Sequence, residues 1–232
     1  MIDVILSAAG LLITSPVLLA VGTAIVLYDR GSPFYVSGRV GRFGRVFPMI
    51  KFRSMMVNAD KTGVTSTSSV DRRITPVGHF VRRFKLDELI QLWNVLMGDM
   101  SLVGPRPNVP SGVAVYTSVE RRLLDVRPGI TDFSSIVFAD EGEILSNHED
   151  ADRAYDQLIR PWKSRLGLFY VDNRGNWLDF RIILTTLLAV VARNQALTRT
   201  HSLLLRYGAA TELARIALRR EPLAPARPPG AE

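Results

Sequence analysis

The chain has 232 residues, a size that suits one large domain or a domain with appendages. Its formal net charge is +7, and a chain this basic favours nucleic acid, anionic lipid or phosphorylated substrates as partners. It has no cysteine, which excludes disulfides, zinc–thiolate sites and a cysteine nucleophile. Hydrophobic residues make up 47% of a chain that is 22% charged, so we expect the apolar residues to be clustered.

The first apolar cluster is the uncharged stretch of residues 4–28. As a helix it would be about 37 Å long, enough to span a hydrocarbon core of about 30 Å. A signal peptide is a weaker interpretation, because no basic region precedes the stretch and no small-residue cleavage site follows it. By the positive-inside rule the chain after this stretch is cytoplasmic, because four arginines follow it closely: Arg30, Arg39, Arg42 and Arg45.

Ser15 and Pro16 lie near the middle of this apolar stretch. Proline removes a backbone donor and clashes with the preceding turn, so we expect the helix to kink there. The residues alone leave two topologies open. One is a kinked helix that spans the bilayer, which a lone proline favours. The other is a re-entrant helix, whose two ends lie on one face of the membrane.

Short elements are predicted after the apolar stretch. Residues 34–36 and 46–52 read as two strands joined by a glycine-rich connection. That connection could hold a phosphate, but a surface hairpin turn is the favoured interpretation. The polar residues 57–72 predict a loop. Two helices are expected next, a short basic one at residues 77–84 and one at residues 86–97 with its apolar side chains on one face.

The second half of the chain predicts mostly helices. A mixed-charge helix is expected at residues 150–170. The apolar residues 177–191 are short for a membrane span and favour a buried or interfacial helix. Residues 203–220 are basic and amphipathic, which is typical of a helix at a membrane surface. The Pro/Ala-rich tail after Glu221 predicts disorder.

Asp87 and Glu88 are adjacent acids in the first turn of the predicted helix at residues 86–97. Alone, such a pair is best explained as a helix cap. Arginine matches phosphate oxygens, whereas a carboxylate can bind Mg²⁺ or attack phosphorus. Phosphoryl transfer on an amphiphilic substrate is therefore indicated by five cations that lie beside proline, glycine or strand ends: Lys51, Arg53, Arg82, Arg106 and Arg127.

The same residues belong to motifs that carry a family resemblance. In order and composition the chain resembles the bacterial sugar transferases, the small monotopic phosphoglycosyl transferases that act on undecaprenyl phosphate. The resemblance runs from the apolar stretch to about residue 190. It rests on these motifs: Lys51-Phe52-Arg53-Ser54-Met55, Leu86-Asp87-Glu88-Leu89, Gln91-Leu92-Trp93-Asn94-Val95, the block from Gly98 to Pro107, and Arg127-Pro128-Gly129-Ile130-Thr131.

The resemblance implies a mainly helical α+β fold on the cytoplasmic face of the bacterial inner membrane. We expect a re-entrant membrane helix at residues 1–29, because the Ser15-Pro16 pair matches the break of the family's helix. A catalytic domain at residues 30–195 would contain the small β-hairpin and interfacial amphipathic helices. Residues 196–232 would form a basic amphipathic helix and a flexible tail. Because many members carry a larger N-terminal membrane region, the chain resembles the minimal catalytic unit.

The resemblance also implies a reaction. A sugar 1-phosphate would pass from a nucleoside diphosphate sugar, usually a UDP-sugar, to undecaprenyl phosphate, with release of UMP, as the first membrane step of exopolysaccharide, O-antigen, capsule or glycoprotein assembly. Asp87 would attack the sugar-bearing phosphate, form a covalent phosphosugar–aspartate intermediate and contact Mg²⁺. Glu88 would assist metal or proton handling. The phosphates would be held by Arg82, Arg106 and Arg127, with Lys51 and Arg53 as looser candidates.

Three positions depart from the family pattern and bear on substrate details more than on the reaction. Phe84-Lys85-Leu86 stands where Ser or Thr with Leu is usual, Ile90 replaces a proline, and Asp132 replaces a frequent glycine. The family's charged residues are all in place.

Two other functions are weighed against the transferase. A non-catalytic basic membrane-associated scaffold is the alternative, and the intact Asp87, Glu88 and Arg106 argue against it. A nucleic-acid-binding protein would explain the basic charge but neither the apolar helix nor the acids, so no nucleic-acid partner is expected. The expected partners are undecaprenyl phosphate, the nucleotide sugar and inner-membrane lipids, with a homodimer left open.

Overall fold

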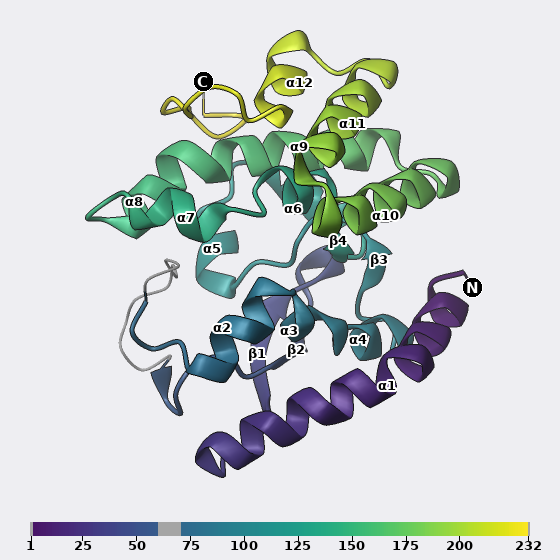
Figure 1. The fold of residues 1–232 in the computed structure, drawn as a ribbon. Coiled ribbons are helices and arrows are strands. Elements are labelled where there is room, and N and C mark those ends of the chain that lie inside the picture. The colour runs from purple at the N-terminus through teal and green to yellow at the C-terminus, as the bar shows by residue number, and fades with distance from the viewer. Residues whose placement is uncertain (1, 60–70, 232) are drawn as a thin grey trace.

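The computed structural model describes residues 2–59 and 71–231, and most of the predicted loop at 57–72 lies outside them. The protein is mainly helical with two small two-stranded sheets, so the predicted α+β class is confirmed. In Figure 1 the first half of the chain, in purple and blue, forms one layer. The helices of the second half, in green and yellow, form another layer above it.

The first helix, α1 (Ile2–Asp29), is continuous through Pro16. Near the proline, the hydroxyls of Thr14 and Ser15 each donate to a backbone carbonyl earlier in the helix, both at 2.7 Å. Leu12 and Ile13 are 76% exposed, as expected of a helix that packs only one side against the protein. Within residues 2–59 and 71–231, α1 is the one helix long and apolar enough to cross a membrane.

The predicted hairpin is present as β1 (Phe34–Val40) and β2 (Val46–Phe52), paired antiparallel. Strand β1 is longer than predicted. A 3₁₀ turn over Arg42–Gly44 joins the strands, and its last residue has φ 79°, which glycine adopts without strain. The side chain of Asn94 bonds to the free edge of β2. Its amide oxygen accepts from the Ile50 backbone N–H at 3.0 Å, and its amide nitrogen donates to a carbonyl of β2.

The helix predicted at 77–84 is confirmed as α2 (Pro76–Arg83), whereas the single helix predicted at 86–97 is wrong. That segment forms two short helices, α3 (Leu86–Leu89) and α4 (Leu92–Leu96). Lys85 enters α3 with φ 55°, so the chain turns sharply after α2. Between the short helices, the backbone N–H of Gln91 donates to the carbonyl of Glu88, three residues earlier, whereas an α-helix bonds four residues back. This tighter turn separates the two helices.

A parallel pair of strands, β3 (Ser101–Val103) and β4 (Gly129–Thr131), lies between the two layers (Figure 1). The two backbones approach closely at Gly129, where an added Cβ would lie 2.1 Å from the backbone nitrogen of Gly104. This approach explains the glycine in the Arg-Pro-Gly motif. The pairing sets the turn at residues 104–107 beside residues 127–131, a neighbourhood that no local pattern in the sequence predicts.

The second layer surrounds one hydrophobic core, in which Phe133, Leu166 and Leu204 are fully buried. A π-helical turn at Tyr155–Ile159 interrupts the helix that was predicted at 150–170. The remaining helices of this half, besides a 3₁₀ helix at Glu120–Asp125, are α5 (Pro110–Ala114), α6 (Phe133–Val137), α7 (Glu141–Ser146), α8 (Ala151–Ala154), α9 (Arg160–Asn173), α10 (Asn176–Val191), α11 (Arg193–Arg206) and α12 (Thr211–Ala217).

The prediction of one amphipathic helix at 203–220 is wrong, because the segment contains two helices. Gly208, with φ 83°, ends α11, and the chain folds back into α12. The apolar side chains of the stretch join the core instead, with Leu204, Ala214 and Ala217 fully buried. An amphipathic pattern cannot say whether protein or lipid covers its apolar face, because both remove that face from water.

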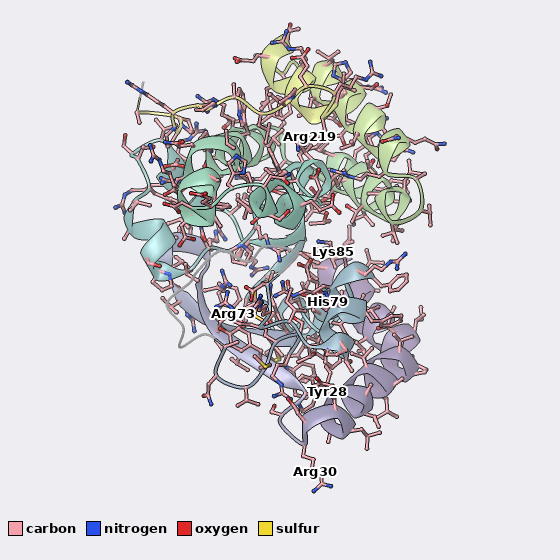
Figure 2. All side chains as sticks on the ribbon, turned by 60° about the vertical axis from the view of Figure 1, so that its left-hand side comes forward. Tyr28, Arg30, Arg73, His79, Lys85 and Arg219 are labelled. Carbon is pink, nitrogen blue, oxygen red and sulfur yellow. The ribbon has the colours of Figure 1, made fainter. Side chains whose placement is uncertain are left out.

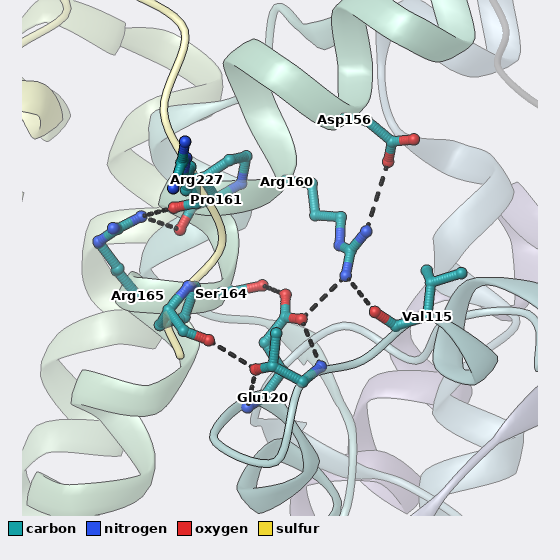
Figure 3. A network of polar contacts seen from close by, with 10 residues as sticks. Val115, Glu120, Asp156, Arg160, Pro161, Ser164, Arg165 and Arg227 are labelled. Atoms are coloured by element: carbon teal, nitrogen blue, oxygen red, sulfur yellow. Dashed lines mark hydrogen bonds and ion pairs between the residues drawn. The ribbon is translucent and has the colours of Figure 1, made fainter. Parts of the chain in front are cut away.

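The tail after Glu221, predicted to be flexible, has no helix or strand but lies against α9 and the segment before it. The Arg165 guanidinium donates to the backbone carbonyl of Arg227 at 2.9 Å (Figure 3). Two more hydrogen bonds hold the backbone of the tail. The backbone N–H of Ala226 donates to the carbonyl of Gln157 at 2.9 Å, and the hydroxyl of Thr117 donates to the carbonyl of Pro229 at 2.5 Å.

A buried acid network lies beneath the tail. Glu120 is fully buried and accepts hydrogen bonds from Arg160 at 2.9 Å and Ser164 at 2.7 Å (Figure 3). The same Arg160 guanidinium also donates to the carbonyl of Val115. A buried carboxylate is tolerated only with such partners, so this network joins the 3₁₀ helix firmly to α9.

Candidate active site

Asp87 and Glu88 occupy the first turn of α3, as predicted, but neither acts as a helix cap. The N-cap residue is Lys85, and no side chain satisfies the free amides there. Glu88 instead accepts a hydrogen bond from the guanidinium of Arg106. Within the described part of the chain, the Oδ1 atom of Asp87 is buried and has no hydrogen-bond partner. The helix-cap interpretation is therefore replaced by an acid pair whose members have different surroundings.

Glu88 is an ionised acid paired with a cation. Arg106 reaches it from the irregular turn at residues 104–107, which the β3–β4 pairing places beside α3. Burial alone would raise the pKa of Glu88, but the charges of Arg106 and Lys51 outweigh burial and hold it at about 2. Glu88 in turn raises the pKa of Arg106. The pair stays fully charged at neutral pH.

Asp87 has the opposite tendency. Burial raises the pKa of its carboxyl, and the neighbouring charge of Glu88 raises it further. Nearby cations oppose this shift without removing it: Lys51, Arg106 and Arg82. Adjacent carboxyls whose pKa values are pushed apart are typical of sites where the two acids have different chemical roles. Asp87 combines weak solvation with a free oxygen atom, which suits a nucleophile or a metal ligand.

Two of the predicted cations converge on Asp87 along with Arg106. Lys51 comes from β2, and burial together with the Arg106 charge lowers its pKa to about 8. Arg82 comes from the last turn of α2, where its Nε donates to the Ser54 hydroxyl at 2.8 Å. Burial lowers the pKa of Arg82 while the Asp87 charge opposes that change. The site is therefore rich in positive charge around one unpaired carboxylate oxygen.

Arg39, predicted only as one of the arginines that follow the apolar stretch, is a further cation at the site. Burial, and then the charge of Arg106, lower its pKa. Tyr35 lies opposite Lys51 in the hairpin, and Arg39 follows Tyr35 by four residues, so it points to the same face of the sheet. The period of two along β1 was the signal that could have identified it.

The structure does not bring Arg53 and Arg127 to the acid pair. Arg53 forms an ion pair with Asp29 at the end of α1, with a nitrogen–oxygen distance of 2.6 Å. Arg127 lines a separate cleft of about 240 Å³, which it shares with Arg42 and Arg174. The backbone of the Arg-Pro-Gly motif still has a role near the site, because it approaches the turn that carries Arg106.

The family model described as bacterial sugar transferase matches residues 1–193. The chain belongs to this family. It is 36% identical over 192 residues to an undecaprenyl-phosphate glucose phosphotransferase of Komagataeibacter xylinus. It is 34% identical over 200 residues to a UDP-glucose:undecaprenyl-phosphate glucose-1-phosphate transferase of Xanthomonas campestris pv. campestris. A third relative, an undecaprenyl-phosphate galactose phosphotransferase of Salmonella typhimurium, is 34% identical over 209 residues.

These alignments cover 80% to 84% of the chain but only 34% to 40% of each relative. The chain therefore spans well under half the length of these three relatives. All the residues that converge on Asp87 lie inside the matched region of this sugar transferase family.

Asp87, rather than the acid pair as a whole, suits the Mg²⁺ ion that the family resemblance implies. Within residues 2–59 and 71–231, no group of three or more acidic, histidine or cysteine side chains is assembled for a metal. Mg²⁺ in phosphoryl-transfer sites commonly takes one or two carboxylates and completes its shell with water and substrate phosphates. The free Oδ1 atom of Asp87 suits such a ligand, whereas Glu88 is already engaged with Arg106.

Proposed function

We propose that the chain transfers a sugar 1-phosphate from a UDP-sugar to undecaprenyl phosphate. The observation that carries this proposal is the buried, unpartnered oxygen of Asp87 with Lys51, Arg82 and Arg106 around it. A nucleophilic oxygen among cations is what attack on the diphosphate of a nucleotide sugar requires. The relative from Xanthomonas is named for this donor and this acceptor, and its likeness supports the same substrate class here.

In the proposed first step, the Asp87 carboxylate attacks the sugar-bearing phosphorus. A new bond forms between that oxygen and phosphorus, and the bond from phosphorus to the bridging oxygen breaks. UMP leaves with the bridging oxygen, and the enzyme keeps the sugar phosphate as an acyl phosphate. In the second step, a phosphate oxygen of undecaprenyl phosphate attacks the same phosphorus. The acyl phosphate bond breaks, which frees Asp87 and releases undecaprenyl diphosphate sugar.

The cations explain how two negatively charged substrates can meet at a carboxylate. Arg82, Arg106 and Lys51 would offset phosphate charge, and Arg39 would add to their field. Glu88 would position Arg106, because a carboxyl with a pKa of about 2 does not exchange protons near neutral pH. Mg²⁺, when bound at Asp87, supplies further neutralisation of the diphosphate.

The contacts at both ends of α1 support a monotopic, re-entrant placement in the membrane. Near its N-terminus, Asp3 accepts a hydrogen bond from Ser101 of β3 at 2.7 Å. At its C-terminus, Asp29 pairs with Arg53 just after β2. Both ends therefore contact the same globular body, which is simplest if that body and both helix ends lie on one side of the bilayer. The cytoplasmic side follows from the arginines after α1.

The absence of cysteine makes this topology directly testable. A single cysteine at Asp3 or at Arg30 can be probed in intact cells and inverted vesicles with a membrane-impermeant maleimide. A re-entrant helix predicts that both cysteines react only in inverted vesicles. Labelling of the two positions from opposite sides would show a spanning helix.

The reaction is tested with Asp87→Asn. We expect this variant to bind a UDP-sugar but to lose UMP release and trapping of a labelled phosphosugar on the protein. Asp172→Asn is a matched control, because Asp172 pairs with Arg122 at an exposed position far along α9. Retention of activity in Asp87→Asn would refute the nucleophile. Binding of UDP-sugar by the unmodified chain without any UMP release would favour a non-catalytic scaffold.

A further inference from the structure

A second charged cluster occupies the upper layer. Glu141, in the first turn of α7, forms an ion pair with Lys163 of α9. The ammonium of Lys163 also lies 5.4 Å from the ring centre of Tyr155. The Lys163 and Glu141 side chains are 18% and 31% exposed, so the cluster is neither part of the core nor freely solvated. We call Glu141, Lys163 and Tyr155 the upper cluster.

The upper cluster is linked electrostatically to Arg106, the arginine that pairs with Glu88. Burial would raise the pKa of Glu141, but the charges of Lys163, Arg106 and Lys85 lower it. Lys85 immediately precedes α3, and Figure 2 places it at the level between the two layers. Tyr155 in turn makes a small electrostatic contribution that raises the pKa of Arg39 of β1, against the larger effect of burial. Arg106 is paired with Glu88, and the charge of Glu141 also raises the pKa of this arginine.

The local backbone explains how Tyr155 reaches this position. It begins the π-helical turn that precedes α9, and π-helical turns are frequent at functional sites because the extra residue redirects a side chain. Pro161 at the start of α9 is compatible with this change of helix type, since proline needs no amide partner in a first turn. The tail bonds the middle of the turn through Gln157, which holds it in place.

The chemistry of the upper cluster differs from that of the site around Asp87. Around Asp87 the excess of cations suits phosphates, whereas a carboxylate such as Glu141 repels them. A carboxylate accepts hydrogen bonds from neutral hydroxyls, an ammonium donates to hydroxyl oxygens, and a tyrosine ring offers an apolar face. In a nucleotide sugar the ring is joined through one oxygen atom to the phosphorus that Asp87 attacks. The group that meets the upper cluster would therefore be the sugar.

We propose that Glu141, Lys163 and Tyr155 form the subsite that binds the sugar ring and selects among nucleotide sugars. Glu141 accepts hydrogen bonds from ring hydroxyls, Lys163 donates to a neighbouring hydroxyl or acyl oxygen, and Tyr155 covers one face of the ring. This inference rests on the proposed function, since it assigns the sugar of the same donor. A site that hydrogen-bonds a hydroxyl rejects an epimer or deoxy sugar because a buried polar group is then left unpaired.

The test compares Glu141→Gln and Lys163→Met with the unmodified chain on UDP-glucose, UDP-galactose and their N-acetylated forms. UMP release gives kcat/KM for each sugar, and calorimetry gives the Kd of UDP, which has no sugar ring beyond ribose. We expect kcat/KM for the preferred sugar to fall about 100-fold and the preference over its epimer to fall about tenfold. The Kd of UDP should stay within about threefold.

Controls separate sugar recognition from folding. The Arg122–Asp172 pair is another ion pair of α9, at an exposed position, so Asp172→Asn should leave every sugar preference unchanged. Glu141→Asp keeps the charge but withdraws it by one methylene group, and it should give a smaller loss of preference with an unchanged melting temperature.

Three results would overturn the subsite. Unchanged preferences in both variants would show that the upper cluster does not bind the sugar. An equal loss of UDP affinity and of activity on every sugar would assign the pair to the nucleotide or its phosphates. If the unmodified chain releases no UMP from any nucleotide sugar, the proposed function itself fails. In the first two results the proposed function stands.

Discussion

The guanidinium of Arg106 donates a hydrogen bond to Glu88, and the neighbouring Asp87 keeps a buried oxygen with no partner among the described residues. The two adjacent acids therefore have opposite properties. Glu88 is held ionised with a pKa of about 2, whereas burial and the Glu88 charge raise the pKa of Asp87. This arrangement supports the proposed roles, in which Glu88 positions the arginine and Asp87 reacts.

Replacement of Glu88 tests this division of roles. Glu88→Gln removes the carboxylate that is paired with the half-buried Arg106, and we expect a loss of about 2 kcal/mol in unfolding free energy. The substitution also removes the charge that raises the pKa of Asp87, so the acidic limb of the pH–activity profile should move to lower pH. Chemical denaturation in detergent and the pH profile measure the two effects. An unchanged stability would contradict the pairing, while Asp172→Asn should cost under about 1 kcal/mol.

Lys51 predicts an alkaline limit to activity. Its pKa is lowered to about 8, so its positive charge is lost as the pH rises through that value. UMP release should therefore decline above about pH 8. Lys51→Arg keeps its charge at these pH values and should extend activity to higher pH, even if the rate at neutral pH falls. A Lys51→Arg variant with the same alkaline limb would assign that limb to another group.

The same lysine also affects stability. Its ordinary pKa is 10.5 and its folded pKa is about 8, so between these values the unfolded chain binds more protons. The unfolding free energy contributed by Lys51 should therefore rise with pH across that window. Lys51→Met removes the effect, and melting temperatures taken at several pH values above 8 measure it.

The close packing of Gly78 against Ser54 allows a test of the contact between Ser54 and Arg82. An added Cβ at Gly78 would lie 1.8 Å from the carbonyl oxygen of Ser54, so α2 must move away from that strand end. Arg82 of α2 donates to the Ser54 hydroxyl and would move as well. We expect Gly78→Ala to cost more than about 2 kcal/mol and to reduce activity. Gly175→Ala is the control, because a Cβ there meets nothing within 4 Å.

We expect the tail to stabilise the folded chain through hydrogen bonds of its backbone. Removal of residues 221–232 would delete the groups that bond Gln157, Thr117 and Arg165. At about 1 kcal/mol for each hydrogen bond, the loss should reach about 3 kcal/mol, and amide exchange should quicken in the π-helical turn. Because Arg165 binds the carbonyl of Arg227, Arg227→Ala should resemble the unmodified chain. A truncated chain with unchanged exchange would show that the tail does not hold the turn.

Local patterns were enough to predict several parts of this protein. The apolar stretch, the hairpin and the position of Asp87 in a first helical turn depend on hydrophobic periodicity and turn residues, which neighbouring residues determine. The motifs around Lys51 and Asp87 also indicated the family before any contact was known. The helix at 86–97 was predicted as one piece because its apolar spacing is regular, and the tight turn at Gln91 is a tertiary adjustment.

Only the tertiary structure decided which charges meet. The parallel pairing of β3 and β4 brings Arg106 to Glu88, and strand register brings Arg39 to the face that carries Lys51. Arg53, from the same motif as Lys51, points instead to Asp29, and Arg127 lines another cleft. A sequence motif lists chemical groups in order, but their convergence depends on contacts between distant segments. That is why the sequence by itself indicated phosphate chemistry at Asp87, while the fold selected the cations around it and revealed the cluster at Glu141.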